Sequence, residues 1–221
     1  MLGKLVVDGD APRACAHFLA QRIIRAGRPM HVAFSGGRSP WKMVEQLVLV
    51  PLSWEQVTVW QVDERVASDL DETRNWTHLW SRFTVPAKFS PIPVDVKCDP
   101  EGAAAARRYA DMLGGSDTRG ILDLVHLGLG DDGHTASLFP GDSALELREP
   151  DAVAVGPYLG HRRVTLTLPC LERARALVFL VTGSNKREPL KRLLAGDVRI
   201  PAGRLRHPDF TVFADPEAAG T

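Results

Sequence analysis

The sequence ILDLVHLGLGDDGHTASLFPG, residues 121–141, decides how the rest of the chain is interpreted. Residues 121–129 form the most hydrophobic run of strand type, which predicts a strand buried at the centre of a sheet. Gly128 through Gly133 then spell G-x-G-x-x-G. The context nevertheless disfavours a dinucleotide site, because Pro140 would stop the required helix and two aspartates would face the phosphates.

His134 is the feature of this turn that points to chemistry. The imidazole follows a glycine-rich strand end and lies beside the carboxylate of Asp132. A lone histidine is more often structural than catalytic, but one in such a setting is the strongest candidate for a general base in this chain. The other six histidines lack comparable neighbours.

Outward from this stretch, short apolar runs alternate with helical patterns along the whole chain. This alternation predicts an α/β fold with a mostly parallel sheet covered by helices. We expect a single domain spanning residues 1–221, with a surface connection at residues 86–93 and a frayed tail after Asp215. The expected strands are residues 4–7, 31–34, 57–62, 121–129, 152–155, 164–168, 177–182 and 211–214, and the expected helices are residues 11–26, 40–50, 73–83, 101–113 and 185–194.

Composition narrows the function classes. The 221 residues are 44% hydrophobic and 24% charged, which is typical of a folded globular protein. Lys plus Arg and Asp plus Glu number 27 each, so net charge offers no case for nucleic acid or membrane as a partner. Three cysteines without C-x-x-C spacing favour a reducing compartment over disulfides or a structural zinc site. No apolar stretch is of membrane-spanning length, so we expect a cytoplasmic protein.

A second strand end carries the turn Ser35, Gly36, Gly37, Arg38, Ser39, Pro40. Glycines let backbone N–H groups approach a ligand, and the following helix presents its positive end, which suits a phosphate. An ordinary tight turn fits the same residues about as well. Ser39 is the expected helix cap with Pro40 in the first helical position. The spacing fits neither a Walker motif nor a nucleophile elbow.

Two further strand ends carry charge with two interpretations each. Asp63, Glu64 and Arg65 could form a solvated ion-pair cluster, or Arg65 could face an anion or an oxyanion. Lys186, at the start of a helix, could complete an anion site or remain solvated. Arg163, before the strand at residues 164–168, has the same ambiguity.

Taken together, these segments resemble the 6-phosphogluconolactonases, which share a superfamily with the glucosamine-6-phosphate isomerases. The resemblance rests on Ser35-Gly-Gly-x-Ser-Pro, Asp63-Glu-Arg-Val with Asn75, Gly128-x-Gly-x-Asp-Gly-His-Thr-Ala-Ser-Leu-Phe-Pro-Gly, Arg163-Val-Thr-Leu-Thr and Gly183-x-x-Lys. It implies a three-layer Rossmann-like fold and hydrolysis of 6-phospho-D-glucono-1,5-lactone, a small sugar-phosphate substrate, with no metal, cofactor or obligate protein partner.

The resemblance also implies residue roles. His134 would be the base, residues 35–39 with Lys186 would hold the phosphate, and Arg65 and Arg163 would contact further negative charge. Asp63 matches an acidic position that acts as a base in the isomerases. Ser39 replaces the usual threonine, and Arg74 stands where serine is usual, which predicts altered charge at the mouth of the site.

The expected mechanism is attack of water on the lactone carbon with His134 as base and Asp132 orienting the imidazole. Either Arg65 or backbone N–H groups of residues 128–133 would face the oxyanion. One alternative is an isomerase and deaminase, but residues 137–140 lack the carboxylate that those enzymes carry after the histidine. Another alternative is a sugar-phosphate sensor without catalysis.

Overall fold

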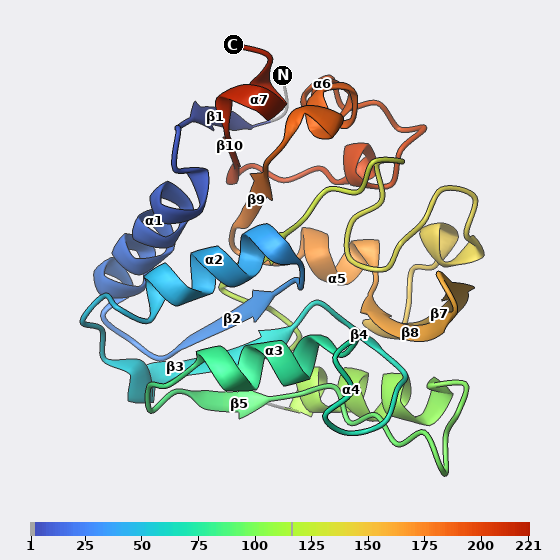
Figure 1. Cartoon of the computed structure of the whole chain (residues 1–221). Coiled ribbons are helices and arrows are strands. Elements are labelled where there is room, and N and C mark those ends of the chain that lie inside the picture. The colour runs from blue at the N-terminus through green and yellow to red at the C-terminus, as the bar shows by residue number, and fades with distance from the viewer. Residues whose placement is uncertain (1–2, 116) are drawn as a thin grey trace.

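A central sheet of seven parallel strands organises the structure, a computed structural model that describes residues 3–115 and 117–221 (Figure 1). The strand order is β1-β10-β9-β6-β2-β3-β5, so the predicted central strand, β6, does lie in the middle. All four of its residues are buried, as its unbroken apolar sequence requires. The strands are β1 Lys4–Val7, β2 Met30–Phe34, β3 Val57–Gln61, β5 Lys88–Ser90, β6 Leu124–Leu127, β9 Leu177–Val181 and β10 Phe210–Ala214.

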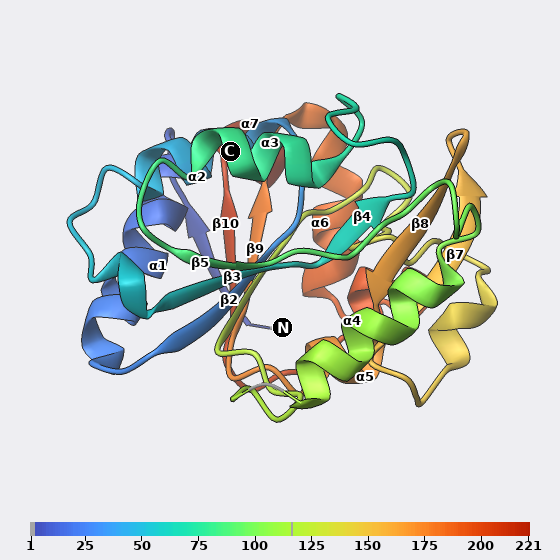
Figure 2. The ribbon, with the colours of Figure 1, turned by 90° about the horizontal axis from the view of Figure 1, so that it is seen from below.

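Helices cover both faces of this sheet and complete the predicted three-layer α/β fold (Figure 2). Side chains alternate along each strand, so Val32 and Phe34 of β2 enter one apolar core while Ala33 enters the other. The first core contains α1 Ala11–Ala26, α2 Arg38–Leu47 and α3 Asn75–Arg82. The second contains α4 Ala103–Gly115, α5 Leu168–Glu172, α6 Arg187–Leu194 and α7 Pro216–Ala219.

A second, antiparallel sheet of three strands corrects the sequence-based prediction. It consists of β4 Asp63–Arg65, β8 His161–Leu166 and β7 Ala152–Tyr158. The prediction that β7 and β8 continue the central sheet is therefore wrong, because β8 pairs with β4 and β7 instead. Val62 connects the sheets: its N–H donates to Phe34 at 3.0 Å, and its carbonyl accepts from Leu166 at 2.9 Å.

Three smaller predictions are also wrong. The connection at residues 86–93 contains the edge strand β5, which pairs with β3. Helix α2 is capped by Gly37, with φ +129°, rather than by Ser39, so it begins at Arg38. The segment after Asp215 is the helix α7 rather than a frayed tail.

Asp215 explains why the C-terminal segment is ordered. Its Oδ1 accepts a hydrogen bond from the Ala218 N–H at 2.7 Å, which caps α7, and both carboxylate oxygens accept from the Gly183 N–H. One side chain thus joins α7 to the end of β9. Helix caps of this kind contribute about 1 kcal/mol.

We expect Asp215→Ala to lower the free energy of unfolding by about 1–2 kcal/mol, because the cap and the Gly183 contact are lost together. Asp215→Asn keeps an acceptor oxygen and should lose less. Urea unfolding followed by circular dichroism measures both. Equal stability of the alanine variant and the wild type would contradict this role.

Candidate active site

A cavity of about 860 Å³ opens at the carboxyl ends of the central strands. Ligands of open α/β sheets bind at this edge, where strands pass into helices. The second sheet forms one wall through Asp63, Arg65 and Arg163. The cavity brings together all eleven residues that the sequence analysis proposed for the site: Ser35, Gly36, Gly37, Arg38, Ser39, Asp63, Arg65, Asp132, His134, Arg163 and Lys186.

The tight turn after β6 sets the orientation of His134. The Gly130 N–H donates to the His134 carbonyl at 2.8 Å, and the imidazole packs so closely on Gly130 that a Cβ there would lie 2.0 Å from Nδ1. Nδ1 is 2.6 Å from Oδ1 of Asp132. A carboxylate at Nδ1 favours the tautomer protonated there, so Nε2 carries the lone pair that can accept a proton.

Asp132 is suited to hold that tautomer. Partial burial alone would raise the pKa of Asp132, but the backbone N–H and imidazole of His134 lower it below its ordinary value. The group is therefore an anion at neutral pH. Its Oδ1 also accepts the His134 backbone N–H at 3.0 Å, so one oxygen fixes both the backbone and the ring.

The turn at residues 35–40 also lines the cavity. Gly36 is required by close packing: a Cβ would lie 1.9 Å from Oδ1 of Asn75. The Ser35 hydroxyl is buried without a hydrogen-bond partner among the described residues. Ser39 bonds through its hydroxyl to Thr182, which ties the start of α2 to the end of β9. The free N–H groups at the start of α2 suit an anion.

Asp63 lines the cavity and is buried, with 4% of its surface exposed. Its Oδ2 accepts the Ser137 hydroxyl at 2.6 Å, and Asn75 donates to its backbone carbonyl at 2.9 Å. Ser137 in turn lies 3.4 Å from Nη1 of Arg163. Asp63 therefore connects β4, α3 and the turn that follows His134.

Two guanidinium groups, Arg65 and Arg163, line the same wall. Nη1 of Arg65 donates to the Thr73 carbonyl at 2.6 Å and to Oδ1 of Asn75 at 3.1 Å. The Nε atoms of both arginines are buried without a partner among the described residues. Burial and the charge of Arg65 lower the pKa of Arg163, although Asp63 opposes this. Two neighbouring guanidinium groups that repel each other suit a bound anion.

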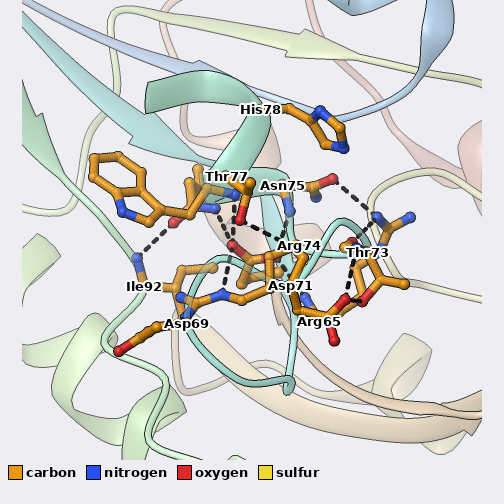
Figure 3. A network of polar contacts seen from close by, with 12 residues as sticks. Arg65, Asp69, Asp71, Thr73, Arg74, Asn75, Thr77, His78 and Ile92 are labelled. Carbon is orange, nitrogen blue, oxygen red and sulfur yellow. Dashed lines mark hydrogen bonds and ion pairs between the residues drawn. The ribbon is translucent and has the colours of Figure 1, made fainter. Parts of the chain in front are cut away.

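Glu64 and Arg74 depart from the sequence-based predictions. Glu64 is fully buried, so Asp63, Glu64 and Arg65 are not a solvated ion-pair cluster. Arg74 is buried as well, with contacts to Glu64 at 3.6 Å and to Asp69 at 2.6 Å, and it does not line the cavity. The predicted change of charge at the mouth of the site is therefore wrong. Figure 3 shows Arg74 beside Asp69 and Arg65 reaching Asn75.

Lys186 belongs to the short helical turn Ser184–Lys186 after β9, and its ammonium group forms an ion pair with Asp131. Asn185 donates to the same carboxylate oxygen at 2.9 Å. The hydrogen bond from Lys186 lowers the pKa of Asp131 more than partial burial raises it. Lys186 is thus held in the cavity by a carboxylate rather than solvated.

Several lining residues were not proposed from the sequence. Lys42 lies one helical turn after Arg38, so the helical period of α2 could have indicated it. Thr182 and Asn185 flank the Gly183 turn, where only Lys186 drew attention. Phe139 lies inside the motif that carries the resemblance and received no role. Leu159 follows the end of β7 and had no signal at all.

Within residues 3–115 and 117–221, no three His, Cys, Asp or Glu side chains are grouped to hold a metal ion. In the same part of the chain, no helix combines the length and apolar character needed to span a membrane.

Comparisons with known proteins agree with this architecture. Residues 10–213 match the family described as glucosamine-6-phosphate isomerases/6-phosphogluconolactonase. A 6-phosphogluconolactonase of Synechocystis is 37% identical over 174 residues, covering 74% of this chain and 71% of the relative. The crystal structure of a devB protein superimposes with a TM-score of 0.83 and 26% identity, covering 99% of both chains.

The human GDH/6PGL endoplasmic bifunctional protein is 34% identical over 199 residues, which cover 85% of this chain. The chain spans only about a quarter of that relative's length, 24%. The family match alone extends over most of the chain, well beyond the motifs that line the cavity. This chain therefore belongs to the family of glucosamine-6-phosphate isomerases and 6-phosphogluconolactonases.

Proposed function

We propose that this protein hydrolyses 6-phospho-D-glucono-1,5-lactone to 6-phospho-D-gluconate. The observation that carries the proposal is the arrangement of His134. Its Nδ1 is occupied by Asp132, and its Nε2 is left to act in a cavity that also holds a Gly-Gly turn and Lys186. The names of the relatives in this family support the same substrate.

The phosphate of the substrate binds, in this proposal, at the start of α2. The backbone N–H groups of residues 36–39 supply directed donors, and Arg38, Lys42 and Lys186 supply positive charge. This end of the substrate takes no part in the bond that breaks. Its binding energy therefore serves to orient the lactone ring over His134.

Hydrolysis then needs one proton to move twice. Neutral His134 accepts a proton at Nε2 from a water molecule as that water attacks the lactone carbonyl carbon. The tetrahedral intermediate collapses with cleavage of the bond to the ring oxygen, which takes the proton back from the imidazole. Asp132 stabilises the imidazolium formed between the two steps. General-base assistance of this kind contributes about 10²–10⁴-fold.

The oxyanion of the intermediate has two sets of candidate donors. Arg65 contributes a guanidinium from the wall formed by the second sheet. Backbone N–H groups of residues 128–133 are the alternative, because this turn also lines the cavity. Either set would act by preorganised electrostatics, since the donors are fixed before the substrate binds.

The main alternative function is isomerisation with deamination of glucosamine 6-phosphate, because the family includes both kinds of enzyme. Residues 137–139 are Ser-Leu-Phe, so no carboxylate follows His134 at the expected place. Phe139 instead stacks on the imidazole. This contact favours the hydrolase.

We also propose a cytoplasmic location. Cys15, Cys98 and Cys170 are all unpaired, and Cys98 is exposed. An exposed free thiol suits a reducing compartment.

The wild-type protein should hydrolyse freshly made 6-phosphogluconolactone much faster than gluconolactone, because only the first carries a phosphate for the site at the start of α2. A coupled assay with phosphogluconate dehydrogenase, corrected for spontaneous hydrolysis, measures turnover of 6-phosphogluconolactone. Titration of the acid released compares the two lactones directly. Ammonia release from glucosamine 6-phosphate would instead favour the deaminase. Phosphogluconate binding by calorimetry without turnover would favour a sensor.

His134→Ala should lower kcat by about 10²–10⁴-fold, since the attacking water loses its base. His17→Ala is the matched control, because this exposed histidine of α1 lies outside the cavity. A near-wild-type kcat in the His134 variant, after subtraction of spontaneous hydrolysis, would rule out the base assignment.

Lys186→Ala should raise KM by at least about tenfold and lower kcat less, because the lysine contacts the remote phosphate in ground state and transition state alike. Lys191→Ala, which removes an exposed lysine of α6 outside the cavity, should leave both constants unchanged. Steady-state kinetics of the two variants gives the comparison. If KM does not change in the Lys186 variant, the residue does not belong to the phosphate site.

A further inference from the structure

Three aromatic rings form a continuous stack that ends on His134. The imidazole and the Phe139 ring have centroids 4.3 Å apart and planes inclined by 27°. Phe139 and Tyr158 have centroids 4.0 Å apart and planes inclined by 23°. His134 and Phe139 line the cavity, whereas Tyr158 does not. Tyr158 thus packs against Phe139, the ring that stacks on the imidazole, and lies outside the cavity lining.

The backbone folds back so that Phe139 can reach a residue only five positions earlier. The Leu138 N–H donates to the Thr135 carbonyl at 3.0 Å, and Ala136 adopts a left-handed conformation with φ +54°. This tight turn returns the chain over His134. The contact between the two rings is therefore built into the local backbone.

Tyr158 is fixed by a closed circuit of contacts. Its hydroxyl donates to Oδ2 of Asp142, and the Asp142 N–H donates to the Phe139 carbonyl at 3.1 Å. Burial, together with the adjacent Asp142, raises the pKa of Tyr158 to about 12, so the phenol stays protonated and remains a donor. Tyr158 is therefore linked to Phe139 twice, through Asp142 and through the contact between the two rings.

Charged groups also contact the rings of this stack, but they do not fix the plane of the imidazole. The Arg163 guanidinium lies 5.6 Å from the Phe139 ring centroid, and Asp132 binds the imidazole edge at Nδ1. A hydrogen bond at one nitrogen leaves the ring free to tilt about the axis through that bond. A flat ring against the imidazole face removes this freedom.

We propose that Tyr158 is a positioning residue that acts through Phe139 to hold the plane of the His134 imidazole, so that Nε2 keeps its direction into the cavity. For turnover, this inference rests on the proposed lactonase function. Tyr158 lies on β7, in the second sheet, and the sequence analysis gave it no role. The second sheet would then support the base as well as supplying Arg163.

Tyr158→Leu and Tyr158→Phe test the inference as a matched pair. The leucine removes the ring, whereas the phenylalanine keeps it and loses only the hydroxyl. We expect kcat of Tyr158→Leu to fall by about tenfold with KM within about twofold of wild type, because misdirection of the base affects the reacting geometry more than phosphate binding. Tyr158→Phe should restore most of that kcat.

Nuclear magnetic resonance of the imidazole gives a readout independent of activity. The His134 ring protons are assigned by their loss in His134→Ala, and stacking on Phe139 should shift them upfield in the wild type. They should move downfield in Tyr158→Leu and stay near the wild-type position in Tyr158→Phe. Phe139→Leu serves as a second variant if Tyr158→Leu does not fold, with the same expected fall in kcat and downfield shift.

Unchanged His134 resonances in the folded leucine variants would overturn the proposal, as would a rise in KM at constant kcat. It would also be overturned if Tyr158→Phe were as impaired as Tyr158→Leu. If the wild type shows no lactone turnover, the proposed function fails, and the resonances alone then decide whether Tyr158 holds the imidazole.

Discussion

The buried carboxylate of Glu64 is the constraint on which the site depends. It accepts hydrogen bonds from the side chain of Gln61 and from the backbone N–H groups of Arg65, Asn75 and Trp76, at 2.7–2.8 Å. Burial raises its pKa more than these donors and the charge of Arg74 lower it. A buried carboxylate is tolerated only when such donors surround it. Glu64 therefore fixes the start of α3 against β4, next to the cavity residues Asp63, Arg65 and Asn75.

The same junction joins the two sheets. Val62 bonds to the central sheet through its N–H and to β8 through its carbonyl, so the chain leaves one sheet and enters the other within a single residue. Asp63 and Arg65 consequently lie on the second sheet, while Ser35 and Lys186 follow strands of the central one. The cavity therefore receives cationic groups from both sheets. This arrangement suits an extended substrate with an anion at one end and an ester at the other.

The sequence indicated the parts of this structure that depend on local patterns. Strand and helix runs, the Gly-Gly turn and the histidine turn are local, and the motifs placed all eleven proposed residues around one cavity. The errors involve partners distant in the chain. Strand β8 was assigned to the wrong sheet because hydrophobicity does not specify the strand it pairs with. The prediction that Arg74 lies at the mouth of the site failed for the same kind of reason. Its contacts with Glu64 and Asp69 belong to the folded structure and leave no local pattern in the sequence.

The charges that line the cavity nearly balance, so its net charge would attract an anion only weakly from a distance. Five cations line it, Arg38, Lys42, Arg65, Arg163 and Lys186, against four carboxylates, Asp63, Asp131, Asp132 and Asp215. The carboxylates hold several of the donors in place, as Asp131 holds Lys186, and cancel most of the long-range attraction. In the proposed function, binding of the phosphate would then rely on short contacts with the backbone N–H groups and the cationic side chains of the cavity. Such partly buried contacts are screened by salt much less than a surface charge would be.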